Sequence, residues 1–281
     1  MPIAYPEVLE LAGEEERLVW TDQRAMLYAL SIGLGSDPLD ARELPFVYEN
    51  GLKAVPTLAT VLTLPMTLLA RTGVNFARVV HGEQGLVLHR PMPPEGEATA
   101  VTRVAAVYDK GADKGAVLIL QSELTEPSGQ PLATLRSSIF ARADGGFGGP
   151  PGEDETRPVP DRAPDQSLEF ATRPDQALLY RLNGDRNPLH ADPAFARMLG
   201  FPRPILHGLC TYGIACRAVL QACADFDPAR IRSVQARFSA PVFPGETVTV
   251  DLWREGVEVA FQARVKDREA VVIRNGRSEL R

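Results

Sequence analysis

A stretch rich in glycine and proline, residues 143–167, constrains the fold of this chain more than any other feature. Of the 20 residues from Gly145 to Pro164, 10 are Gly or Pro. Such a run cannot propagate a helix or a strand ladder, because proline lacks a backbone donor and glycine loses the most conformational freedom on folding. We therefore expect a linker over residues 143–167 that divides the chain into residues 1–142 and residues 168–281.

The two parts carry similar short motifs in the same order, each pair about 150 residues apart. The pairs are YALS at Tyr28 and YRLN at Tyr180, PTLAT at Pro56 and PILHG at Pro204, and PMPPEGE at Pro91 and PVFPGE at Pro241. One match of this kind carries little weight, but three in register indicate a duplicated fold. The period is too long for a solenoid, whose repeats span ~20–50 residues.

The carboxy-terminal part has the pattern of one buried helix followed by strands. Residues 207–223 place apolar side chains at helical spacing with Arg217 almost their only charge, which predicts a deeply buried helix. Beyond Pro228 the apolar period changes to two. We expect antiparallel strands over residues 231–241, 247–253, 257–265 and 270–274. A buried helix followed by a run of strands indicates an α+β fold in which a sheet wraps around the helix.

The amino-terminal part repeats the strands but not the helix. Strands are expected over residues 97–108, 116–124 and 132–142. Pro65 falls inside the matching apolar stretch, residues 55–70, where it costs ~3 kcal/mol or more and breaks a helix. The first part should therefore have a degraded central helix.

The sharpest motif is the segment YRLNGDRNPLHADP, residues 180–193. It places a carboxylate, an amide and an imidazole within six residues, at Asp185, Asn187 and His190. Asn187 precedes a proline and is therefore extended, so the loop runs outward before it re-enters a helix. This course can aim Asp185 and His190 at one point from two sides. An acid and a base that converge there can hold one water molecule and move its protons.

Each of these residues also has a purely structural explanation. Asp185 follows Gly184 and can form an Asx turn, Asn-Pro is a common turn, and His190 can cap the helix that follows. The three residues together favour a functional site over three unrelated turn residues.

Gly208 is the second candidate, because it opens the long buried helix. The first N–H groups of a helix have no partner within the helix, and the dipole there favours negative charge. A glycine lets a ligand approach the backbone closely, so Gly208 N–H is a candidate oxyanion donor for a carbonyl group. The alternative is that Gly208 only permits tight packing of the helix.

The charge balance and the apolar pattern exclude several classes of partner. Lys and Arg number 30 against 36 Asp and Glu, for a net charge of −6, which argues against a nucleic-acid partner. The most apolar stretch, residues 55–70, is broken by threonines and Pro65 and is shorter than the ~18 residues of a membrane span. Three cysteines cannot build a disulfide framework and suit a reducing compartment. We expect a cytoplasmic protein without a membrane partner.

Other polar residues give weaker signals. Cys210, Cys216 and Cys223 lie on the predicted buried helix and are expected to be core thiols. His81 and His89 flank Gly-containing turns and are expected at the surface. Asp185, His190 and His207 lack the short spacing of a metal site. The sequence has no dinucleotide-binding glycine motif, no Walker motif and no Gly-x-Ser-x-Gly elbow.

The segment YRLNGDRNPLHADP, followed by PILHGLCTYG, closely resembles the MaoC-like, R-specific (type 2) enoyl-CoA hydratases. Looser matches to the amino-terminal half of that family occur in YALSIGLGSDP, LPFVYENGLKAVPTLATV and HGEQGLVLHRPMPPEG. The resemblance implies two hot-dog folds in one chain, each an antiparallel sheet around a central helix. It also implies that the first fold lacks the catalytic motif.

The resemblance implies reversible addition of water to a trans-2-enoyl-CoA, which gives an (R)-3-hydroxyacyl-CoA. Asp185 and His190 match the catalytic pair, and Asn187 matches the residue that orients the pair and the water. Gly208 matches the glycine whose N–H binds the thioester oxygen. No metal or prosthetic group is implied. We expect an acyl-CoA substrate and a homodimer, and leave open which of Asp185 and His190 is acid and which is base.

Three other functions remain open at this point. A dehydratase that acts on acyl-carrier-protein esters, a hot-dog thioesterase and a non-enzymatic acyl-CoA-binding protein all suit the same fold.

Comparison of the two parts supports a division of roles between them. With short gaps, Leu34 stands in place of Asp185, and Asp40 in place of His190. Ala59-Thr60 stands where the second part has His207-Gly208. We therefore expect the first part to keep the shell of the fold without its chemistry.

The interrupted helix should leave a cavity inside the first sheet that accepts a long or bulky acyl tail. The expected lining is apolar and consists of Leu58, Val61, Leu62, Leu64 and Leu68, or of residues close to them. The alternative is that these side chains collapse inward and fill the space.

Overall fold

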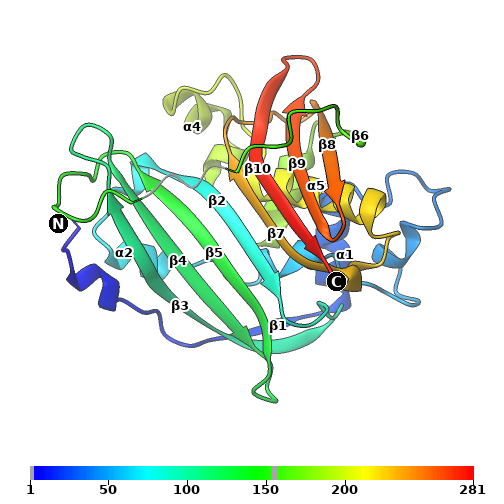
Figure 1. The fold of residues 1–281 in the computed structure, drawn as a ribbon, viewed down its shortest axis with the longest axis horizontal. Helices are drawn as coiled ribbons and strands as arrows, with labels where there is room; N and C mark the ends of the chain where they lie inside the picture. The colour runs from blue at the N-terminus through cyan, green and yellow to red at the C-terminus, as the bar shows by residue number, and fades with distance from the viewer. Residues whose placement is uncertain (1–2, 153–156) are drawn as a thin grey trace.

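The computed structural model describes residues 3–152 and 157–281. Their strands form one antiparallel sheet of ten (Figure 1). The strands are β1 Glu16–Trp20, β2 Val79–Leu88, β3 Gly96–Asp109, β4 Ala116–Thr125, β5 Pro131–Ala141, β6 Gln166–Ala171, β7 Ile231–Phe238, β8 Thr247–Glu255, β9 Glu258–Val265 and β10 Ala270–Leu280.

The strand order proves that the fold is duplicated. The order is β1-β3-β4-β5-β2-β7-β10-β9-β8-β6, so the second five strands repeat the connections of the first five in mirror-related positions. The two halves meet where β2 pairs with β7, from Glu83 opposite Arg237 to Val87 opposite Ser233. The expectation of two hot-dog folds of the α+β class is confirmed.

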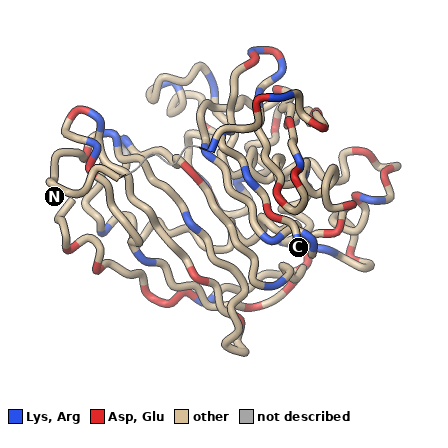
Figure 2. Tube along the Cα trace, in the orientation of Figure 1, with Lys and Arg blue, Asp and Glu red and all other residues tan. Residues whose placement is uncertain are grey.

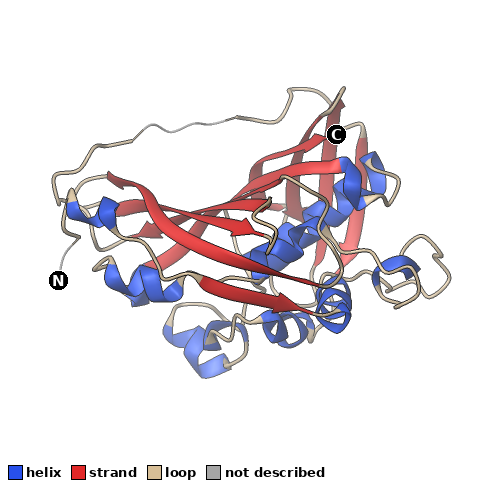
Figure 3. Cartoon of the chain, turned by 90° about the horizontal axis from the view of Figure 1, so that it is seen from below, coloured by secondary structure: helices blue, strands red, loops and turns tan. Residues whose placement is uncertain are grey.

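The helices lie against the inner side of the curved sheet (Figure 3). The α-helices are α1 Asp22–Ser31, α2 Met66–Arg71, α3 Gln176–Tyr180, α4 Pro193–Met198 and α5 Gly208–Cys223. The short 3-10 helices are η1 Glu7–Glu10, η2 Leu44–Phe46, η3 Pro56–Val61, η4 Phe76–Arg78, η5 Arg181–Asn183, η6 Pro188–His190 and η7 Pro228–Arg230. Among the described residues, no helix is long and apolar enough to cross a membrane.

The central helices of the two halves differ as the sequence predicts. In the second half, α5 runs unbroken for 16 residues, and nearly all of its side chains are buried. In the first half, η3 ends at Val61, and α2 starts after Pro65, which occupies its N-cap. The proline therefore divides the equivalent apolar stretch into two short pieces, with a gap between them.

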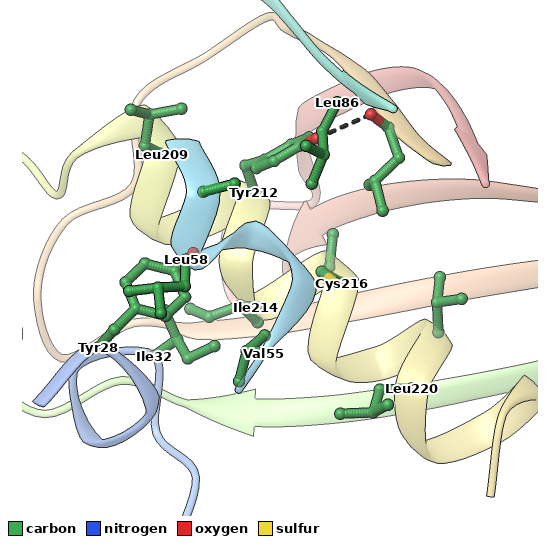
Figure 4. Close-up of a cluster of buried hydrophobic side chains, with 14 of the residues drawn as sticks. Tyr28, Ile32, Val55, Leu58, Leu86, Leu209, Tyr212, Ile214, Cys216 and Leu220 are labelled. Carbon is green, nitrogen blue, oxygen red and sulfur yellow. Dashed lines mark hydrogen bonds between the residues drawn. The ribbon is translucent and has the colours of Figure 1, made fainter. Parts of the chain in front are cut away.

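The main hydrophobic core surrounds α5 and includes residues of both halves (Figure 4). Val55 and Leu58, from the η3 segment, and Tyr28 and Ile32, from the α1 segment, pack against α5. On the other side, Tyr212 donates a hydrogen bond of 2.7 Å to the backbone oxygen of Val234 in β7. A second, smaller core lies under β3, β4 and α2. Residues of both halves therefore pack against one long helix.

Several described residues of the Gly/Pro-rich segment form hydrogen bonds with strand residues. The Asp109 carboxylate accepts hydrogen bonds from Gly111, Gly146 and Gly148 N–H. Farther along, Arg277 donates to the Pro158 oxygen. The sequence did not predict β1, β2 or β6, and β6 begins at Gln166, so it includes the last two residues of the expected linker. Each of the three is short or interrupted by polar residues, which weakens its period-two pattern.

Residues of both charges are interspersed along the chain (Figure 2). Lys and Arg lie among Asp and Glu on the loops and at the strand ends. This distribution agrees with the small net charge of −6.

Candidate active site

A cavity of about 920 Å³ runs from the β7 side of the second half into the interior of the first sheet. It is lined by the four candidate residues Asp185, Asn187, His190 and Gly208. From the first half, it is lined by residues of η3, α2, β2, β4 and β5. The structure therefore gathers every predicted site residue around one space that both halves enclose.

The loop between η5 and η6 has the local geometry of two successive turns. Asp185 Oδ1 accepts a 3.0 Å hydrogen bond from Asn187 N–H, and Asn187 Oδ1 accepts one of 3.0 Å from Leu189 N–H. Asn187 has φ −51° and ψ 126°, the extended conformation expected before proline. The structural explanations for Asp185 and Asn187 are therefore correct, but they use only Oδ1 of each side chain. Asn187 fixes the Asp185 carboxylate through its backbone.

His190 and Asp185 converge as predicted. The His190 side chain is buried, and its Nδ1 lies 2.8 Å from the Ile205 oxygen. A carbonyl oxygen only accepts, so Nδ1 carries the proton and donates it. His190 Nε2 then lies 4.0 Å from Asp185 Oδ2, whose side chain remains 41% exposed. Two acceptors at this separation leave room for one water molecule to donate a hydrogen bond to each.

Burial lowers the pKa of His190, because the positively charged form loses water. The Ile205 carbonyl and the Asp185 carboxylate oppose this shift. The net lowering leaves the imidazole neutral near pH 7, so its Nε2 is a hydrogen-bond acceptor.

His207 is the main residue that sequence reasoning did not assign to the site. Its ring stacks on that of His190 with centroids 3.6 Å apart and planes 24° apart. Its Nε2 lies 3.1 Å from the Asp185 backbone oxygen and donates to it. Tyr180 contacts the ring with a centroid distance of 4.9 Å. His207 therefore touches both members of the pair. Its only sequence signal is its place just before Gly208.

Asp185, His190 and His207 together hold three potential metal donors within 4.8 Å. The spacing in the sequence did not predict this proximity. The lone pairs of an imidazole lie in the plane of its ring, and these two rings are nearly parallel. Lone pairs in nearly parallel planes do not point at one ion, so the arrangement suits a bound water better than a tetrahedral metal site.

Gly208 is the first residue of α5, and His207 is its N-cap. The first bonds within the helix are donated by Cys210 and Thr211 N–H, both to the His207 oxygen. Gly208 N–H therefore precedes the first intrahelical donor, at the positive end of the helix dipole. A Cβ at Gly208 would lie 3.4 Å from the Phe238 ring. The glycine thus opens the backbone to the cavity and also packs closely against β7.

The expectation that His81 lies at the surface is wrong. His81 lines the cavity from β2, edge-on to Phe238 with ring centroids 5.1 Å apart. Its Nε2 lies 3.0 Å from the Glu83 oxygen, and burial lowers its pKa to about 4. A β-bulge between His81 and Glu83 turns the imidazole inward, which strict alternation along the strand does not predict. His89 is exposed, as expected.

The first half has no comparable pair at the matching positions. Leu34 is fully buried in the core, and Asp40 pairs with Arg42 at 2.7 Å outside the cavity. Thr60, opposite Gly208 in the comparison of halves, lines the cavity from η3.

The cavity reaches the first half as expected, but its lining differs from the expected one. Val61 and Leu64 line it, whereas Leu58, Leu62 and Leu68 are packed in the two cores. These leucines are buried in the cores instead, and strand residues of β2, β4 and β5 complete the lining of the cavity.

Comparisons with known proteins agree across both halves. Residues 19–143 match the MFE-2 hydratase 2 N-terminal domain, and residues 155–275 match the MaoC-like domain. Enoyl-CoA hydratase ChsH3 of Mycobacterium tuberculosis is 41% identical over 92% of this chain and 91% of its own. The 3-hydroxyacyl-thioester dehydratase Y of the same organism is 44% identical over 84% and 82%. The crystal structure of a MaoC-like dehydratase from Phytophthora capsici superposes with a TM-score of 0.87 at 35% identity, over 98% of this chain and 96% of that one.

Proposed function

Because the chain belongs to the MaoC-like dehydratase family, in the form that joins an MFE-2 hydratase 2 N-terminal domain to a MaoC-like domain, we propose a hydration mechanism for its site. The protein is a hydro-lyase that adds water reversibly to a trans-2-enoyl-CoA and gives an (R)-3-hydroxyacyl-CoA. The observation that carries the mechanism is the 4.0 Å separation of Asp185 Oδ2 and His190 Nε2 beside the start of α5.

Asp185 and His190 hold the attacking water through its two protons. As the water oxygen bonds to C3 of the enoyl group, His190 Nε2 takes one proton, and the nearby carboxylate stabilises the imidazolium. Electrons move from the C2=C3 bond toward the thioester oxygen, where Gly208 N–H stabilises the developing enolate. The imidazolium then gives a proton to C2. The pair ends in its starting state, and one water molecule has been added.

His207 positions this pair and does not react. It fixes the Asp185 backbone through its Nε2–H and covers one face of the His190 ring. Burial and the neighbouring His190 lower its pKa, so it stays neutral beside the imidazolium that forms during the reaction.

The full-length protein with a four-carbon trans-2-enoyl-CoA tests the proposed reaction against its alternatives. Hydration removes the absorbance of the conjugated enoyl thioester without releasing a free thiol. A thioesterase would release thiol, which a thiol reagent detects, and a binding protein would leave the absorbance unchanged. The same acyl group on CoA and on an acyl-carrier protein, compared by kcat/KM, decides between the two carriers.

The acid limb of the pH profile should report His190. The reaction needs neutral His190, and burial lowers the pKa of that imidazole below its ordinary value of ~6.5. We expect kcat/KM for hydration to stay level as pH falls from 7 and to drop only below pH ~6.5. An NMR titration of His190 should give the same midpoint. A lower midpoint is expected in Asp185→Asn, because the carboxylate raises this pKa. A midpoint at or above 6.5 would contradict the assignment.

The cavity predicts acceptance of long acyl chains. Its volume of about 920 Å³ extends beyond the pair into the first sheet, and each buried CH₂ contributes ~0.8 kcal/mol. We expect kcat/KM for eight- and twelve-carbon trans-2-enoyl-CoA to equal or exceed that for the four-carbon ester. A steep fall of kcat/KM with chain length would contradict the prediction that the cavity binds the acyl tail. It would leave the hydratase mechanism intact.

We also propose how the chain is organised. Residues 1–142 form a non-catalytic hot-dog domain, residues 143–167 a linker, and residues 168–281 the catalytic hot-dog domain. The three cysteines are free and buried, which supports work in a reducing compartment, the cytoplasm. A homodimer is the proposed assembly, and sedimentation of the purified chain tests it.

A further inference from the structure

The floor of the cavity inside the first sheet contains buried polar side chains. Gln84 of β2, Ser122 of β4 and Ser137 of β5 all line it, and we call these three the polar band. Gln84 and Ser122 are only 2% and 4% exposed. Around the band the lining is apolar, with Leu120, Leu135 and Ile139.

The strand register places the band on adjacent rows of the sheet. Ser137 lies opposite Gln84, and Ser122 lies opposite Thr102 of β3. Ser137 donates a 2.8 Å hydrogen bond to Gln84 Oε1, and the hydroxyls of Ser122 and Thr102 are 2.7 Å apart. The polar side chains are thus held in place by one another before any ligand arrives.

These bonds do not exhaust the hydrogen-bonding capacity of the band. A serine or threonine hydroxyl has one donor and two acceptor positions. The Ser122–Thr102 contact uses one position of the Ser122 hydroxyl, so the Ser122 oxygen keeps an acceptor position whichever of the two hydroxyls donates. Ser137 donates its proton to Gln84 Oε1 and keeps its lone pairs as acceptor positions. A plain hydrocarbon tail packed here would leave these positions unpaired, so it should bind less well than a tail of equal length that pairs with them.

The band lies farther along the sheet than the reacting centre. On β2, His81 lies close to the reacting centre, because it contacts Phe238, which lies beside Gly208. Gln84 is three residues farther along the strand, and at ~3.3 Å per residue that is about 10 Å. A group at the band therefore belongs to the acyl chain well beyond the C2=C3 bond.

From these contacts we propose that the preferred substrate is a trans-2-enoyl-CoA whose acyl chain carries a hydroxyl group, which the polar band binds. The band itself is uncharged, so it suits a neutral group, and a hydroxyl can donate its proton to the free acceptor positions of Ser122 and Ser137. This inference rests on the proposed hydratase function and narrows its substrate class.

The test compares trans-2-decenoyl-CoA with its 7-, 8- and 9-hydroxy derivatives on the full-length protein. We expect at least one hydroxy derivative to have about 10-fold higher kcat/KM than the unsubstituted chain, the effect of one or two net hydrogen bonds. The discrimination stays modest because the band residues already pair with each other when the ligand lacks a hydroxyl.

Variants of the band should remove this preference. In Ser122→Ala and in Ser137→Ala, the kcat/KM ratio of hydroxy to unsubstituted substrate should fall to about twofold or less. A ratio measured within one variant is independent of the fraction of folded protein. Ser138→Ala is the matched control, because Ser138 is the next residue of β5 and points to the opposite face of the sheet. It should keep the preference.

The same experiment distinguishes failure of this inference from failure of the proposed hydratase function. Equal or better turnover of the unsubstituted chain by the wild type would overturn the inference, as would an unchanged preference in both band variants. Hydration of the four-carbon ester in the same experiment would show that the hydratase function stands without it. Failure to hydrate the four-carbon ester and all four decenoyl esters would overturn the hydratase function itself, and the inference with it.

Discussion

Replacing Asp185 by Asn, or His190 by Ala, should lower kcat by at least ~10²-fold. His190 Nε2 and Asp185 Oδ2 lie 4.0 Å apart, and in the proposed mechanism each variant removes one of the two groups that move or hold the protons of the attacking water. Asn keeps an oxygen that can accept the Asn187 N–H, so the Asp185→Asn loop should keep its turn. Steady-state kinetics with a four-carbon trans-2-enoyl-CoA, alongside circular dichroism, separates loss of chemistry from loss of structure.

Asp40→Asn is the matched control for this prediction. Asp40 stands in place of His190 in the comparison of halves, but it pairs with Arg42 away from the cavity. Its substitution should leave kcat within about twofold. Retention of more than half of the wild-type activity by Asp185→Asn or by His190→Ala would contradict the assigned pair.

Removing the Glu43 carboxylate should destabilise the fold by ~3–5 kcal/mol. Glu43 belongs to the first half and pairs with Arg217 of α5, and both side chains are almost fully buried. Glu43 also accepts the Gly35 N–H at 2.8 Å. Glu43→Ala leaves the Arg217 guanidinium buried without its counter-charge, next to the Phe170 ring. Chemical denaturation of the purified protein measures the loss.

The exposed pair between Arg42 and Asp40 provides the comparison. Arg42→Ala removes an ion pair in which the arginine side chain is 65% exposed, so the unfolding midpoint should hardly move. A Glu43→Ala protein with a midpoint equal to that of Arg42→Ala would show that the buried pair does not hold the two halves together.

The sequence predicted the features that depend on local rules. Pro65 predicted the interruption between η3 and α2, because proline removes a backbone donor wherever it lies. Asn187 before a proline predicted the extended loop that brings Asp185 and His190 together. The repeated motifs predicted two copies of one fold, and the mirrored strand order confirms it.

The features that the sequence missed depend on contacts between distant residues. His207 lies 17 positions after His190 in the sequence, and only the folded loop stacks the two rings. His81 faces inward because of a β-bulge, which has no distinct residue pattern. The register that sets Ser137 beside Gln84 likewise depends on strand pairing across 53 residues, which no local pattern reveals.

The contrast between the two central helices supports the proposal that the halves have different roles. In the second half, α5 fills its sheet and presents Gly208 at its first turn. In the first half, the same stretch is split, and the cavity occupies the interior of the sheet beside β2, β4 and β5. We propose that one copy of the fold positions the reacting groups and that the other supplies space for the rest of the acyl chain.

The most direct test of this account is the configuration of the product. The full-length protein is incubated with trans-2-butenoyl-CoA, and the resulting 3-hydroxybutyryl group is analysed on a chiral column. We expect one stereoisomer, because Asp185, His190 and Gly208 line fixed sides of one cavity, and we expect it to be the (R) product of the proposed reaction. Formation of the (S) product, or of free CoA without a hydroxyacyl product, would contradict it.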